Sequence, residues 1–91
     1  MNIIILDGSQ MTSREKAYNH IAREFRLPEY FGKNLDALYD MLMDMYVNED
    51  TLIILINFSK MKKNLDEYAD KIVAVFEDAR SEKEFMFFVK D

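Results

Sequence analysis

The sequence predicts a two-layer α/β fold, with one three-stranded parallel sheet and four helices in the order β-α-α-β-α-α-β. Three short apolar runs, at residues 2–6, 51–56 and 84–90, predict the strands. The segments between them carry apolar residues at helical spacing and predict the helices. Because a chain of 91 residues holds one modest core, residues 1–91 are expected to form a single domain.

The three expected strands differ in their predicted burial and in their predicted place in the sheet. Residues 2–6 (NIIIL) are rich in β-branched side chains and predict a buried strand. Residues 51–56 (TLIILI) are continuously apolar, which predicts a strand covered on at least one face and placed at the centre of the sheet. Residues 84–90 contain FMFFV and predict the last strand. Helical crossovers between strands imply parallel pairing, with the helices mainly on one face.

The first helix is predicted from its end signals and its apolar face. Thr12, with Glu15 three residues later, is a candidate capping box. Pro28 and Gly32 mark the end of the helical pattern. The residues that share one apolar face are Ala17, Tyr18, Ile21, Ala22 and Phe25.

Three further helical segments follow. Asn34 is placed to cap a helix over residues 34–46, with Leu35, Leu38, Tyr39, Leu42 and Met45 on its apolar face. A short helical turn is expected at residues 58–63. Residues 66–82 predict a long amphipathic helix, whose apolar face comprises Leu65, Tyr68, Ala69, Ile72, Phe76 and Ala79.

Composition argues against several classes of function. Cys is absent, and neither a signal peptide nor a membrane span is recognised, so a cytoplasmic location is expected. The net charge of −5 argues against direct binding to nucleic acid and favours a basic protein as partner. His20, the single histidine, has no nucleophile motif around it and is expected to be a surface or partly buried residue, not a catalyst. No enzyme and no cofactor are therefore expected.

The predicted second helix carries Asp36, Asp40 and Asp44 on the side opposite its apolar face. Like charges at this spacing cost a few tenths of a kcal/mol per pair, and Asp44 lies where the helix dipole also disfavours an anion. A solvated face and a partner-binding face both remain open, although the absence of interspersed Lys favours binding. No Asp/Gly-rich loop of the kind that binds Ca²⁺ is present, so no metal site is expected.

Residues 29–32 (EYFG) precede this helix. Of the adjacent aromatics Tyr30 and Phe31, one is expected in the core and the other exposed, and Tyr suits an interface anchor. Gly32 is expected either to let a partner backbone approach closely or to supply a positive φ. A packed turn without a binding role explains the same residues equally well.

The stretch LPEYFGKNLDALYDML, from Leu27 to Leu42, resembles the signature of the barstar family, small intracellular inhibitors of secreted-type ribonucleases. Weaker agreement in the order of elements extends the resemblance over nearly the whole chain. The resemblance implies a barstar-like fold with a three-stranded parallel sheet. It also implies an inhibitor that forms a 1:1 complex with a basic ribonuclease and blocks its active site. The sequence is silent on oligomeric state, and a monomer is the default expectation for the free protein.

The resemblance assigns roles to individual residues. Tyr30 would stack against catalytic groups of the enzyme, and Asp40 would occupy the position of the scissile phosphate. Asp36 would pair with further basic residues, and Gly32 and Asn34 would line the contact.

Two candidate contact residues depart from the family pattern. Asp44 stands where the pattern has a small glycine, and it could add a salt bridge or clash with an enzyme loop. Asp78 stands where the family has an acid on the fourth helix that contributes to the contact. If the register of the match differs, Glu77 takes that position instead. Two other functions stay open on the same fold: an immunity protein against a different toxin nuclease, and a regulatory adaptor for a basic protein.

Overall fold

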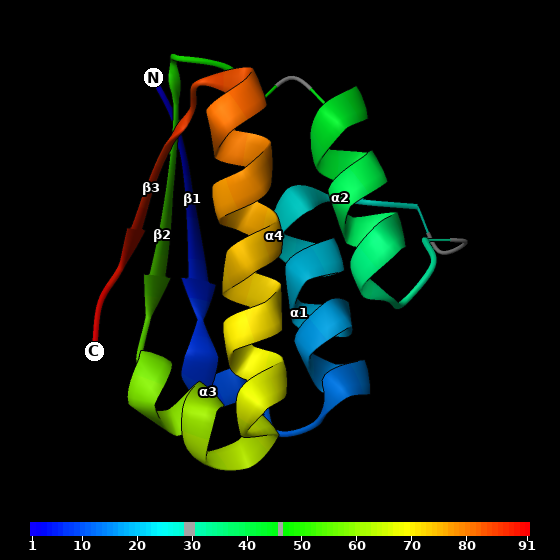
Figure 1. Ribbon diagram of the computed structural model, residues 1–91, viewed down its shortest axis with the longest axis vertical. Coiled ribbons are helices and arrows are strands. Elements are labelled where there is room, and N and C mark those ends of the chain that lie inside the picture. The colour runs from blue at the N-terminus through cyan, green and yellow to red at the C-terminus, as the bar shows by residue number, and fades with distance from the viewer. Residues whose placement is uncertain (29–30, 46) are drawn as a thin grey trace.

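A computed structural model, which describes residues 1–28, 31–45 and 47–91, shows a sheet layer against a helix layer (Figure 1). The predicted order β-α-α-β-α-α-β is confirmed, and a short 3₁₀ helix, η1 (Gly8–Gln10), follows the first strand. The elements are β1 (Asn2–Asp7), α1 (Arg14–Phe25), α2 (Leu35–Asp44), β2 (Thr51–Ile56), α3 (Phe58–Leu65), α4 (Glu67–Lys83) and β3 (Met86–Val89).

The sheet is parallel throughout, with β2 between β1 and β3 as expected from its apolar sequence. Leu6, Ile53 and Phe87 point into the helix layer and are buried. None of the helices formed by the described residues lies over the other face of the sheet (Figure 1). The expectation that residues 2–6 form a buried strand is therefore only half right. Because β1 is an edge strand covered on one face, Ile3 and Ile5 are 56% and 48% exposed.

The core lies between the sheet and the helices α1 and α4. The ring of Phe76 in α4 stacks on Phe87 of β3 at a centroid distance of 5.1 Å and on Phe25 of α1 at 6.3 Å. α2 packs against α4 and lies farther from the sheet than α1 and α4 do (Figure 1). The helix layer therefore holds α2 at the side of the molecule opposite the sheet.

The helix boundaries correct two expectations. Ser13, not Thr12, caps α1, because the Ser13 hydroxyl accepts from the Lys16 N–H at 3.1 Å and the helix begins at Arg14. The short turn expected at residues 58–63 is a full helix that ends at Leu65. Leu65 therefore belongs to α3 and not to the apolar face of the long helix.

A polar network joins the end of β1 to the start of α3, in what we call the β1–η1 corner (Asp7, Gly8, Ser9, His20 and Asn57). One carboxylate oxygen of Asp7 accepts from the Ser9 N–H at 2.9 Å, the Ser9 hydroxyl at 2.7 Å and the Asn57 amide at 2.9 Å. The hydrogen bonds from Asn57 and Ser9 hold the pKa of Asp7 below its usual value. A Cβ on Gly8 would lie 2.5 Å from the Asn57 carbonyl oxygen, so only glycine fits there.

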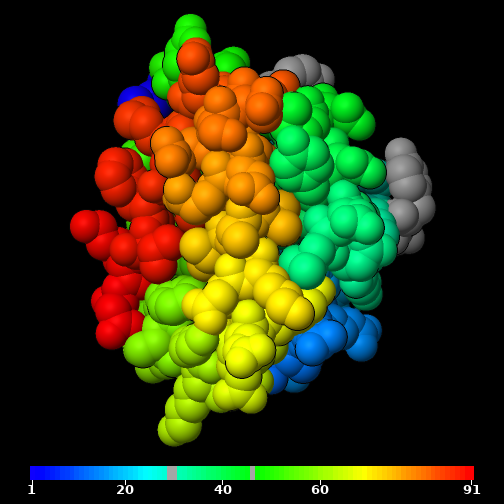
Figure 2. All heavy atoms as spheres, in the orientation of Figure 1, coloured from blue at the N-terminus to red at the C-terminus, as the bar shows by residue number. Residues whose placement is uncertain are grey.

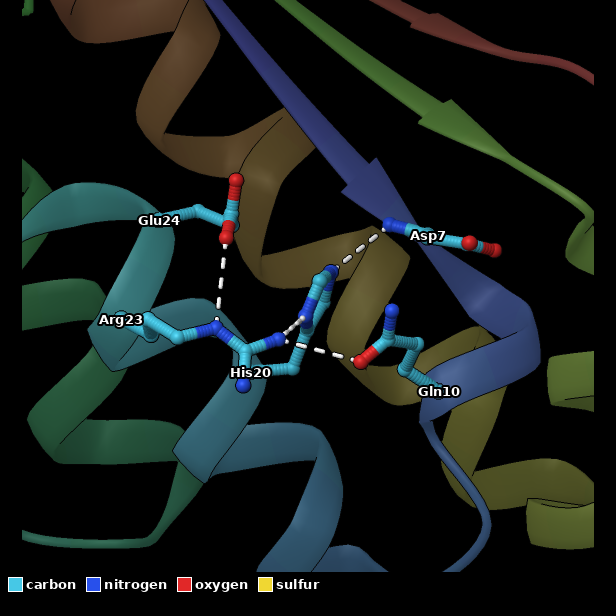
Figure 3. Close-up of polar contacts among 5 residues, drawn as sticks. All are labelled: Asp7, Gln10, His20, Arg23 and Glu24. Carbon is cyan, nitrogen blue, oxygen red and sulfur yellow. Dashed lines mark hydrogen bonds and ion pairs between the residues drawn. The ribbon is translucent and has the colours of Figure 1, made fainter.

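His20 lies inside this corner and is only 4% exposed, more deeply buried than the surface or partly buried position that the sequence predicted (Figure 3). Its Nε2 accepts from the backbone N–H of Asp7 at 2.8 Å. The neutral ring therefore carries its proton on Nδ1, so this nitrogen cannot also accept a hydrogen bond from the Arg23 guanidinium, which lies 2.9 Å away. Burial lowers the pKa of His20; Glu24 opposes this shift and Arg23 adds to it.

Candidate protein-binding site

The acidic face of α2 is formed as the sequence predicts. Leu38 and Leu42 are fully buried beneath the helix. The acidic residues predicted for the opposite side are all exposed, and none of them forms an ion pair with a described residue: Asp36, Asp40 and Asp44. At about 6 Å per four-residue step, the three carboxylates form a row along the helix.

The charge of the whole molecule is concentrated in the same part of the chain. Residues 34–57 contain five acidic residues and neither Lys nor Arg. The other twelve acidic residues are matched in number by the twelve Lys and Arg, so this segment accounts for the net charge of −5. Three of these five acids lie on α2, whereas Glu49 and Asp50 lie just before β2, where Asp50 pairs with the N-terminal ammonium.

Both ends of α2 are fixed by polar contacts. The Asn34 side chain accepts from the Ala37 N–H at 2.7 Å, which confirms its expected role as the N-cap. At the other end, the Lys83 ammonium of α4 donates to the Met43 carbonyl at 2.9 Å. This bond satisfies a carbonyl that has no partner within the helix. No local sequence pattern indicates this bond, because it joins residues forty positions apart.

Phe31, shortly before α2, packs against α1. Phe31 makes an edge-to-face contact with Tyr18 at a centroid distance of 6.3 Å, and Tyr18 packs in the same way on Tyr68. The two tyrosine hydroxyls share a hydrogen bond, and the Arg14 guanidinium lies 4.0 Å from the centre of the Tyr68 ring. Phe31 is thus a packed aromatic. Tyr30, the expected exposed anchor, lies outside the described residues.

The structure corrects part of what the sequence predicted for Gly32. It is exposed, and its φ is not positive, so the expectation of a left-handed turn is wrong. A Cβ at this position would lie 3.0 Å from the Ala37 Cβ. Gly32 therefore lies tightly against the first turn of α2, on the surface of the protein.

The two candidate acids of α4 face different surroundings. Glu77 pairs with Arg80 at 3.0 Å, and both line a hollow beside β3 with Phe87 and Phe88. Asp78 is exposed and has no ion-pair partner among the described residues. Because successive helix residues point about 100° apart, Asp78 turns away from that hollow. Figure 2 shows α4 and α2 side by side on the visible face of the molecule.

Residues 1–28, 31–45 and 47–91 hold no group of three His, Asp or Glu side chains that could bind a metal ion. Within the same ranges, every helix is too short or too polar to cross a membrane. What the site offers is a rigid row of unpaired carboxylates, which suits binding to a cationic surface.

The fold and this acidic helix define a small α/β protein that presents a charged surface on one side. Residues 1–90 match the family described as Barstar (barnase inhibitor), and the chain belongs to that family. It is also 33% identical over 82 residues to a Bacillus subtilis (strain 168) protein named "Putative ribonuclease inhibitor YrdF". The match covers 90% of this chain and 89% of that relative.

Proposed function

We propose that this protein is a stoichiometric inhibitor of a basic, barnase-like ribonuclease and blocks the enzyme's active site with α2 and the preceding loop. Membership of the barstar family and the name of the relative support this function. The observation that carries it is the row of exposed, unpaired carboxylates in the segment that accounts for the net charge. Carboxylates in such a row can occupy positions that RNA phosphates take in a nuclease cleft.

In this proposal Asp40, near the middle of α2, occupies the position of the scissile phosphate, where Arg, Lys and His side chains of the enzyme surround it. Asp36, one turn earlier, pairs with further basic groups. Tyr30 stacks on the catalytic groups. The residues that complete the contact are Gly32, Asn34, Asp44 and, from α4, Asp78.

The fixed geometry of α2 supports tight binding. Asn34 caps its start, Lys83 holds its last turn, and Leu38 and Leu42 anchor its inner side. Little conformational freedom is left for this helix to lose when it meets a partner, and such preorganisation lowers the cost of association. The concentrated negative charge also speeds encounter with a cationic cleft, and salt weakens this effect.

The test is an RNA-cleavage assay with a guanyl-specific, barnase-like ribonuclease, titrated with the protein at low and then at physiological salt. We expect activity to fall linearly to zero at one equivalent, and the apparent affinity to weaken as salt rises. Loss of activity that needs a large excess, or that a different acidic protein reproduces, would contradict active-site blockage.

A second titration separates inhibition from general attraction between opposite charges. A basic protein of similar charge without nuclease activity is mixed with the protein, and complex formation is followed by calorimetry. The proposal predicts heat of binding with the ribonuclease only. Binding to both basic proteins with equal affinity would favour an adaptor role, and binding to neither would favour a different toxin nuclease as target.

A further inference from the structure

Four side chains form a row of contacts that joins α1, α4 and the segment before α2. The Arg14 guanidinium lies 4.0 Å from the centre of the Tyr68 ring. Tyr68 packs edge to face on Tyr18 at a centroid distance of 6.3 Å, and Tyr18 packs on Phe31 at the same distance. We call these four residues the aromatic row. Its last member, Phe31, follows Tyr30 in the sequence, the residue proposed to stack on the ribonuclease.

Tyr18 is the buried centre of the aromatic row. It is only 1% exposed, whereas Tyr68 and Phe31 are half-buried. Its ring contacts Phe31, and its hydroxyl shares a hydrogen bond with the Tyr68 hydroxyl. Tyr18 is thus held at its Cα by α1 and at its hydroxyl by α4, so its ring is a fixed support for Phe31.

The backbone next to Phe31 is hydrogen-bonded as well. The Phe31 N–H donates to the Pro28 carbonyl at 3.1 Å, and the Leu27 N–H donates to the Ala22 carbonyl at 2.8 Å. Phe31 is therefore held through its backbone and through its ring. The ring contact with Tyr18 reaches thirteen positions back along the chain and joins Phe31 to the helix layer.

We propose that Tyr18 is a positioning residue for the ribonuclease contact: through Phe31, it holds the segment before α2 in the conformation that the partner binds. The inference rests on the proposed function and adds to it a residue that is buried and so does not touch the partner. A segment that is already in its bound conformation loses less freedom on association. Without the Tyr18 ring, Phe31 loses its edge-to-face partner, and part of this ordering must occur when the complex forms.

Calorimetric titration into the barnase-like ribonuclease tests this inference with a variant and a matched control. Tyr18→Leu removes the ring but keeps an apolar side chain. Phe76→Leu makes the same kind of change at another fully buried aromatic, which stacks on Phe25 and Phe87. Both variants are titrated well below their unfolding midpoints. We expect Tyr18→Leu to lose about 2- to 10-fold in affinity, the range for one aromatic pair, and Phe76→Leu to bind like the wild type.

Further variants separate positioning from a general structural effect. Tyr18→Phe keeps the ring that supports Phe31, so it should recover most of the affinity that Tyr18→Leu loses. In a Tyr30→Ala background, the loss caused by Tyr18→Leu should largely vanish, because the side chain that benefits from positioning is gone. In an Asp40→Asn background, the same loss should remain.

The outcomes are distinguishable. Equal affinities of Tyr18→Leu and Phe76→Leu, or a loss that persists in full in the Tyr30→Ala background, would overturn the inference while the proposed function stands. A wild type that does not bind the ribonuclease would contradict the proposed function, and this inference with it.

Discussion

The β1–η1 corner and the acidic face of α2 use the same kinds of polar group in opposite ways. In the corner, the Asp7 carboxylate accepts three hydrogen bonds from within the chain. The backbone N–H of Asp7 donates a further hydrogen bond to the His20 ring. On α2, three carboxylates receive none from the described residues and repel one another. The corner stabilises the fold. Repulsion within the acidic face costs a few tenths of a kcal/mol per pair, so we expect its advantage to lie in binding a partner.

The largest expected effect comes from the same substitution made in the two regions. Gly8→Ala places a methyl group 2.5 Å from the Asn57 carbonyl oxygen, in a corner fixed by several hydrogen bonds, and should cost about 1–3 kcal/mol of unfolding free energy. Gly32→Ala meets only the Ala37 Cβ, at 3.0 Å and on the surface, and should cost less than about 1 kcal/mol. Urea unfolding of both variants measures the difference.

Ribonuclease inhibition is measured for the same two variants. Gly32→Ala should weaken inhibition, because the added methyl group lies in the proposed contact. Gly8→Ala, measured well below its unfolding midpoint, should inhibit like the wild type. Weaker inhibition by Gly8→Ala together with unchanged inhibition by Gly32→Ala would contradict this division of roles between the two regions.

The next effect concerns the pH dependence of the corner. His20 is neutral in the fold with a lowered pKa, whereas in the unfolded chain it takes up a proton below about pH 6.5. The unfolded state then binds more protons, so stability is fully present above pH ~6.5 and falls as the pH drops toward the folded pKa. The slope is at most ~1.4 kcal/mol per pH unit.

His20→Gln isolates this contribution, because a glutamine oxygen can still accept a hydrogen bond but does not titrate. Urea midpoints measured from pH 8 to pH 5 should show a slope in the wild type that the variant lacks. Below that range both proteins should lose stability alike, as carboxylates such as that of Asp7 become protonated. Parallel curves over the whole range would show that His20 contributes nothing to the pH dependence.

The smallest effect is expected at the end of α2. Asp44→Asn removes one repulsion with Asp40 and one anion at the unfavourable end of the helix dipole, and should raise stability by a few tenths of a kcal/mol. Differential scanning calorimetry measures this as a small increase in Tm. A decrease in Tm would mean that Asp44 is paired within the chain and that the acidic face is not a purely external feature.

The sequence predicted α2 better than it predicted the corner, for a physical reason. The capping by Asn34 and the row of aspartates depend on residues three and four positions apart, which periodicity makes visible. The corner joins Asp7 to Asn57 across fifty positions, and the burial of His20 depends on where α1 lies against β1. No local sequence pattern predicts contacts between residues so far apart in the chain.

The sheet illustrates the same limit. An apolar run such as NIIIL predicts a strand, but it does not specify how many of its faces are covered. β1 proved to be an edge strand with an open apolar face, where a buried strand was expected. Likewise, the bond from Lys83 to Met43 depends on the packing of α4 against α2, which the sequence alone does not fix.

The central claim is that the acidic face of α2 serves binding and not stability. Asp40→Asn and Asp50→Asn test it most directly, since both remove one charge from an exposed aspartate, the first on α2 and the second beside β2. Calorimetric titration into the ribonuclease and urea unfolding are measured for each. We predict that Asp40→Asn loses about 30-fold or more in affinity, as expected for an enclosed charge pair, whereas both variants unfold within about 0.5 kcal/mol of the wild type. Equal affinities for the two variants, or a loss at Asp40 that follows from unfolding, would contradict the claim.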